Sequence, residues 1–112
     1  MEKTGSRQLA LLECQKAGPG TVGAIIAKIL TMPGISLTVK YEIASGDIGA
    51  FYQQPQIRAI LQSPWSDANL RELAVRETQF YRTQPGTAGF VGQLLGEDGR
   101  FVALKAARNT LF

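Results

Sequence analysis

Hydrophobic residues recur along this chain with two different periods. Within residues 22–30 they are spaced three or four positions apart, which is typical of an amphipathic helix. Gly20 or Thr21 can cap the start of this helix, and Pro33-Gly34 ends it. Within residues 35–43 hydrophobic and polar residues alternate, which predicts a strand with one buried and one solvated face.

The middle of the chain predicts two further helices, and a short run near its start predicts a strand. Pro55 suits the first position of a helix over residues 55–62. Ser66 or Asp67 can cap a longer helix over residues 67–82. The length of the apolar run 9–14 suits a buried strand better than a helix, although periodicity alone does not decide between them.

Two apolar segments near the end of the chain predict a β-hairpin. Residues 90–95 and 101–106 flank Gly96-Glu97-Asp98-Gly99, and both glycines allow the positive φ that a tight turn requires. The predicted order is therefore β-α-β-α-α-β-β. This order indicates an α+β fold in which helices pack on one face of a small mixed or antiparallel sheet. We expect one domain over residues 1–112, since this is close to the commonest domain size.

Composition and charge are those of an ordinary globular protein. Hydrophobic residues make up 45% of the chain, and the net charge is +3. No apolar stretch approaches the roughly 20 residues that span a bilayer, so we expect no membrane segment. Cys14 is the single cysteine, which excludes an intramolecular disulfide and fits a reducing, cytoplasmic location.

One glycine motif could carry ligand chemistry. Gly18, Gly20 and Gly23 form a G-x-G-x-x-G pattern that follows a predicted strand and opens a helix, and Glu42 ends the next strand. Over residues 9–42 this pattern resembles the dinucleotide-binding fingerprint of Rossmann enzymes. The resemblance implies a phosphate held by the glycine loop and a ribose hydroxyl bound by Glu42. The same glycines also suit a strand-to-helix turn with close helix packing, and we prefer this interpretation because short glycine motifs recur by chance.

Residue types that most often perform catalysis or bind metals are scarce. The chain has no histidine and one cysteine, so Ser-His-Asp, Cys-His and histidine-ligated zinc sites are excluded. Cys14 lies in an apolar run, where a free cysteine usually acts as a small hydrophobic residue. We therefore expect no enzymatic activity, no metal and no cofactor.

Aromatic residues near one predicted loop suggest a partner interface. Trp65 follows Pro64 between two helices, and we place Phe51, Tyr52 and Arg58 in the same region. Aromatic residues and arginines are enriched where proteins bind one another. The alternative is that Trp65 packs the loop onto the core.

The leading hypothesis is a non-enzymatic protein-binding module or small accessory subunit of a larger cytoplasmic assembly, with a homo-oligomer as one form of it. The first alternative is binding of a phosphate- or nucleotide-bearing ligand through residues 18–23. The second alternative is weak nucleic-acid binding, for which the candidate residues are Arg58, Arg71, Arg76, Arg82, Phe80 and Tyr81. We do not favour it, because Glu72 and Glu77 lie between these arginines, as on an ordinary solvated helix.

Overall fold

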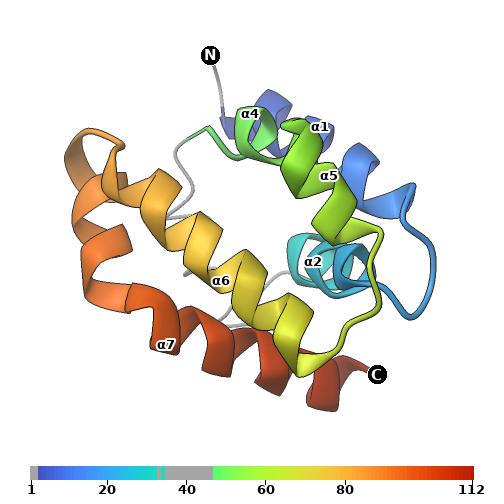
Figure 1. The fold of residues 1–112 in the computed structure, drawn as a ribbon. Helices are drawn as coiled ribbons and strands as arrows, with labels where there is room; N and C mark the ends of the chain where they lie inside the picture. Colours follow the sequence, from blue (N-terminus) through green and yellow to red (C-terminus); the bar gives the residue numbers. More distant parts are fainter. Residues whose placement is uncertain (1–2, 33, 35–46) are drawn as a thin grey trace.

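The computed structural model describes residues 3–32, 34 and 47–112. Within these ranges the chain forms six helices and no strand (Figure 1). None of these helices is both long and apolar enough to cross a membrane. Their bounds are α1 Lys3–Gln15, α2 Val22–Thr31, α4 Ile48–Tyr52, α5 Pro55–Leu61, α6 Asp67–Arg82 and α7 Gly86–Leu111.

The prediction of an α+β fold with a sheet is wrong, and the first error lies in the run 9–14. These residues belong to α1. Ala10 and Cys14 are fully buried, whereas Leu9 and Leu12 are 45% and 55% exposed. Buried positions four residues apart lie on one face of a helix, so the run is half of an amphipathic pattern rather than a buried strand.

The predicted hairpin is also wrong. Residues 90–95 and 101–106 both lie in α7. Gly96 does adopt a positive φ, at 69°, but it breaks α7 into two helical halves, residues 86–95 and 97–111, instead of joining two strands. In the second half the buried positions are Arg100, Ala103, Leu104 and Ala107, which have helical spacing. The remaining predicted strand, 35–43, lies outside the described residues.

Three predicted helices are confirmed, and local signals explain where they begin. α2 buries its apolar stripe as predicted. Pro55 occupies the first position of α5, where its missing N–H costs nothing. Ser66 caps α6, because its hydroxyl accepts a hydrogen bond from the Asn69 backbone N–H at 3.3 Å.

The helices form two groups around a shared core. α6 and the second half of α7 run antiparallel beside each other, while α1, α2, α4 and α5 form a second group that contacts α6 through α5 and α7 through α2 (Figure 1). A single cluster of buried hydrophobic residues contains side chains from all six helices. Its fully buried members from α2 and α6 include Ile25, Ile26, Ile29, Leu70 and Leu73.

Gly23 lets α2 approach the end of α1 closely. A Cβ atom at this position would lie 2.7 Å from the Cβ of Ala17 and 2.9 Å from the carbonyl oxygen of Cys14. Both distances are shorter than non-bonded carbon contacts allow. The last glycine of the motif is therefore needed for helix packing.

We expect Gly23→Ala to lower the free energy of unfolding by about 1–3 kcal/mol, because the added methyl group overpacks this contact. Urea unfolding followed by circular dichroism measures the change. Gly99→Ala is the matched control: its Cβ would make only ordinary contacts, 3.4 Å or more from Leu95, so the better helix propensity of alanine should leave stability equal or higher. Equal stability of the two variants would contradict the packing role of Gly23.

Candidate functional site

The glycine loop predicted as a ligand site is a turn that caps α2. Gly18 and Gly20 have φ angles of 83° and 77°, which glycine adopts without strain. Thr21 is the N-cap of α2, and its hydroxyl donates to the Gly18 carbonyl at 2.6 Å. The hydroxyl therefore tightens the turn and makes no side-chain cap to the helix.

Backbone groups of this loop are joined to the segment between α5 and α6. The Val22 N–H donates to the Ser63 carbonyl at 2.9 Å, and the Trp65 N–H donates to the Gly20 carbonyl at 3.3 Å. A phosphate at the start of α2 would compete with Ser63 for the Val22 N–H. These contacts favour the turn interpretation over a dinucleotide site, and Glu42 lies outside the described residues.

The four residues predicted as a partner interface do not share one surface. Phe51 and Tyr52 are 1% and 0% exposed, so their side chains belong to the core. Trp65 is partly buried, with its ring centroid 4.7 Å from that of Phe112. Arg58 is on the surface and forms an ion pair with Glu13, at 3.1 Å. Local sequence could not separate these outcomes, because burial of an aromatic residue depends on distant neighbours.

A buried polar cluster lies between α4, α6 and α7, and the sequence analysis did not identify it. Glu77 and Arg100 are both fully buried, and the Arg100 Nε atom lies 3.8 Å from the Glu77 Oε1 atom. Tyr52 donates a hydrogen bond of 2.5 Å to Glu77 Oε2. The Arg100 guanidinium carbon lies 4.7 Å from the centroid of the Tyr81 ring, in cation–π geometry.

A pattern in the sequence could have revealed this cluster. Glu77 occupies the same face of α6 as the buried Leu70, Leu73, Ala74 and Tyr81. A charged residue within a buried apolar stripe needs a partner of opposite charge or an extensive set of hydrogen bonds. Arg100 likewise stands in register with the buried face of the second half of α7.

Burial is the largest cause of the raised pKa values of two groups beside this cluster, the Cys14 thiol and the Tyr81 hydroxyl. It raises the pKa of the Cys14 thiol far above its ordinary value, with the nearby Glu77 carboxylate as the next cause. The pKa of Tyr81 is raised for the same two reasons in the same order, and the charge of Arg100 opposes the rise. Cys14 is therefore held as a thiol, which is the unreactive form predicted for it.

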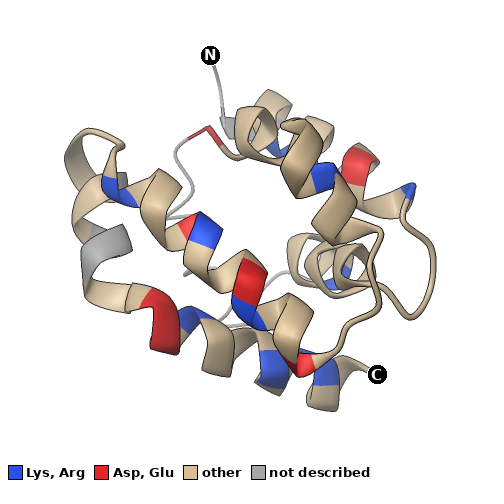
Figure 2. Cartoon of the chain, in the orientation of Figure 1, with Lys and Arg blue, Asp and Glu red and all other residues tan. Residues whose placement is uncertain are grey.

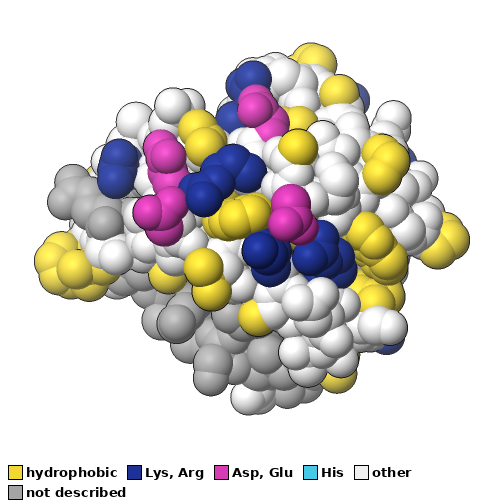
Figure 3. All heavy atoms as spheres, turned by 60° about the horizontal axis from the view of Figure 1, so that its bottom comes forward, with side chains coloured by type: hydrophobic (Ala, Val, Ile, Leu, Met, Phe, Trp, Pro, Cys, Tyr) yellow, Lys and Arg dark blue, Asp and Glu magenta, His cyan; other side chains and the backbone are white. Residues whose placement is uncertain are grey.

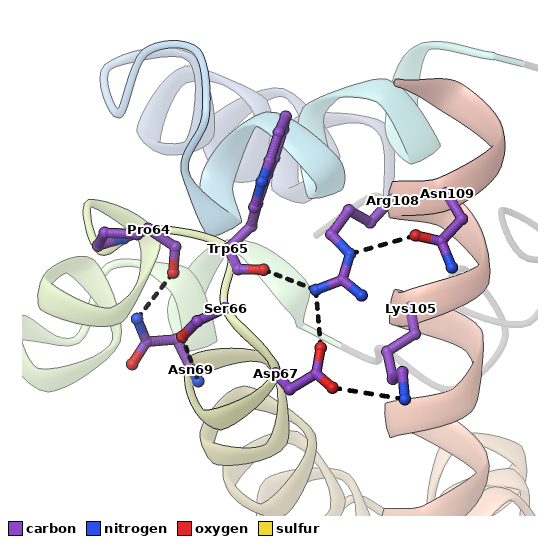
Figure 4. Close-up of polar contacts among 8 residues, drawn as sticks. All are labelled: Pro64, Trp65, Ser66, Asp67, Asn69, Lys105, Arg108 and Asn109. Atoms are coloured by element: carbon purple, nitrogen blue, oxygen red, sulfur yellow. Dashed lines mark hydrogen bonds and ion pairs between the residues drawn. The ribbon is translucent and has the colours of Figure 1, made fainter.

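On the surface, Asp67 joins the start of α6 to the end of α7. Its carboxylate lies between Arg108 Nη1, at 2.8 Å, and Lys105 Nζ, at 3.5 Å (Figure 4). Arg108 also donates to the Trp65 carbonyl at 2.9 Å, so it holds the α5–α6 connection as well. The hydrogen bond from Arg108 is the largest cause that lowers the pKa of Asp67.

Positive and negative side chains are interleaved on the faces of α6 and α7 (Figures 2 and 3). Arg71 pairs with Asp98 at 2.8 Å, and Arg76 pairs with Glu72 at 2.6 Å. Nucleic-acid binding requires a concentrated stripe of positive charge. The pairing on this surface instead alternates positive and negative side chains. The arrangement favours a solvated surface.

Exposed hydrophobic side chains mark a different part of the surface. Phe90 and Leu94 lie one helical turn apart in the first half of α7, and they are 62% and 69% exposed. Val102 is 63% exposed in the second half of α7. Figure 3 shows hydrophobic side chains at the edge of the molecule where α6 connects to α7 in Figure 1.

Comparison with protein-family models, curated proteins and solved structures finds no match for this chain. Within residues 3–32, 34 and 47–112, no group of three or more His, Cys, Asp or Glu residues is placed to hold a metal ion.

We expect Asp67→Asn to lower the melting temperature at neutral pH, because it removes the anion that pairs with Lys105 and Arg108. The folded pKa of Asp67 is depressed, so its contribution is present above its ordinary pKa and is lost as the pH falls through the folded value. The difference from the wild type should shrink between about pH 5 and pH 2, which thermal melts across this range would measure.

Asp98→Asn is the control for this effect, because Asp98 pairs with Arg71 while its side chain is 92% exposed. Pairs between exposed groups contribute little to stability. A loss at neutral pH as large for Asp98→Asn as for Asp67→Asn would contradict the special role of Asp67.

Proposed function

We propose that this protein is a non-enzymatic protein-binding subunit of an assembly, and that it docks through the first half of α7 onto a second copy of itself. The observation that carries the proposal is the exposure of Phe90 and Leu94 on one face of a helix. A buried, free Cys14 fits the reducing cytoplasmic setting predicted from the sequence.

The stretch of sequence around these two residues contains no charged residue. Residues 83–96, which we call the uncharged segment, contain no Asp, Glu, Lys or Arg. In α2 the uncharged residues 22–27 are explained by burial, since the apolar stripe of this helix is in the core. Burial does not explain the run in α7, because Phe90 and Leu94 face solvent. Exposed apolar surface without charge is typical of a docking site.

The chemistry of the segment favours a second copy as the occupant. A charged partner would gain no attraction from an uncharged face and would lose hydration on binding. Two copies of the segment match each other in polarity and do not repel. A two-fold pair would bring the same two apolar side chains of each copy together, as closed symmetry requires.

The size of the patch predicts a weak complex. Two large side chains on each copy bury far less than the roughly 1,600 Å² of a standard interface. We therefore expect a dimer that forms reversibly at micromolar concentrations or above, with the monomer dominant in dilute solution.

Sedimentation velocity over a concentration series tests this proposal. We expect the wild type to shift from monomer towards dimer, and Leu94→Glu to weaken the dimer at least about tenfold, because like charges would face each other in the symmetric contact. Phe90→Glu should act in the same direction.

Val102→Glu is the matched control, since it places the same charge at an equally exposed position in the second half of α7. It should leave the dimer unchanged. A wild type that stays monomeric up to about 1 mM, or equal weakening by Val102→Glu and Leu94→Glu, would show that the proposal is wrong.

A further inference from the structure

Within the part of the chain that the structure describes, the Arg100 side chain has no acceptor for its N–H groups. It is fully buried, yet none of Nε, Nη1 and Nη2 has a hydrogen-bond partner among the described residues. Among the described residues Glu77 forms an ion pair with Arg100, but its Oε1 atom at 3.8 Å from Nε is too far for a hydrogen bond. The buried Tyr81 hydroxyl likewise has no partner of normal hydrogen-bond geometry among the described residues; the Tyr52 hydroxyl is the neighbour that stabilises its ionised form.

These donors predict an acceptor that the described side chains do not supply. A guanidinium group presents five N–H donors, and burying charged donors without acceptors costs several kcal/mol. The Tyr81 ring satisfies the face of the guanidinium through a cation–π contact, but it accepts none of the in-plane N–H bonds. A group that satisfies these donors would therefore lie near the edge of the guanidinium and accept from it.

The geometry points to a binding site for a small carboxylate, with Arg100 as the anchor and the Tyr81 hydroxyl as a second donor. An arginine fork can hold both oxygens of one carboxylate through two parallel hydrogen bonds. This inference goes beyond the proposed docking function, because Arg100 lies in the second half of α7 and the docking residues lie in the first.

The local charge disfavours a ligand with more than one negative charge. Glu77 and Arg100 carry opposite charges and both are buried. Because Glu77 already offsets the arginine, each further negative charge is added to a neutral pair and is repelled by Glu77. A carboxylate adds one such charge, whereas sulfate adds two.

Thermal melts of the full chain in sodium acetate or formate test the site, with sodium chloride and sodium sulfate at equal ionic strength as references. We expect acetate and formate to raise the melting temperature in a saturable way, by about 5 °C at ten times the dissociation constant. Sulfate should give a smaller rise. Equal melting temperatures in acetate and chloride would overturn the proposal.

Arg100→Met should abolish the response to acetate, because it removes the anchor and keeps an apolar stem. Arg82→Met is the matched control, since it makes the same change at an exposed position at the end of α6, and it should respond like the wild type. A response retained by Arg100→Met would also overturn the proposal.

Tyr81→Phe keeps the test decisive if Arg100→Met does not fold. It removes only the hydroxyl and keeps the ring that stacks on Arg100. We expect it to bind acetate at least several-fold more weakly than the wild type. Unchanged acetate binding by a folded Tyr81→Phe would exclude the hydroxyl as the second donor and overturn the site as proposed.

Discussion

The buried attraction between Glu77 and Arg100 constrains how α6 and α7 can pack. At 3.8 Å and an effective dielectric constant of about 20, two unit charges attract by about 4 kcal/mol. The cost of removing each ion from water is also several kcal/mol, so the pair adds little net stability. Separating the two residues would leave an uncompensated buried charge and would cost about 3–5 kcal/mol. The pair therefore mainly fixes the alignment of α7 along α6, because sliding of either helix would separate the two charges.

Surface contacts towards the C-terminal end of α7 favour the same alignment of α6 and α7. Arg71 and Lys105 both lie over the Phe101 ring, at 4.2 and 5.0 Å from its centroid. One turn further, Arg108 reaches Asp67. Cations from α6 and α7 thus share one aromatic ring, and an acid at the start of α6 meets bases at the end of α7. Each contact is individually weak at the surface, but all of them are satisfied by the same antiparallel alignment.

The break at Gly96 separates this aligned part of α7 from the part that we propose as a docking surface. Without this break, residues 86–95 would continue along the helix axis of the second half of α7, which contains Arg100. With φ at 69° and ψ at 175°, Gly96 redirects the chain, which only glycine does without strain. Phe90 and Leu94 consequently do not continue the buried stripe of the second half and remain exposed. The same helix thus contributes a charged residue to the interior and an apolar pair to the surface.

The sequence by itself determined the helices that carry their own start signals and a full apolar stripe. Pro55, Ser66 and the spacing within residues 22–30 act through the backbone and side chains of their own turn, so α2, α5 and α6 were predictable. The run 9–14 and the two segments around Gly96 were too short to distinguish the hydrophobic period of a helix from that of a strand. The prediction of strands failed in these segments. Tertiary structure alone decided that Phe51 and Tyr52 are core residues and that Glu77 and Arg100 meet inside the molecule. The physical reason is that periodicity is a property of neighbouring residues, whereas burial is set by helices that come together from distant parts of the chain.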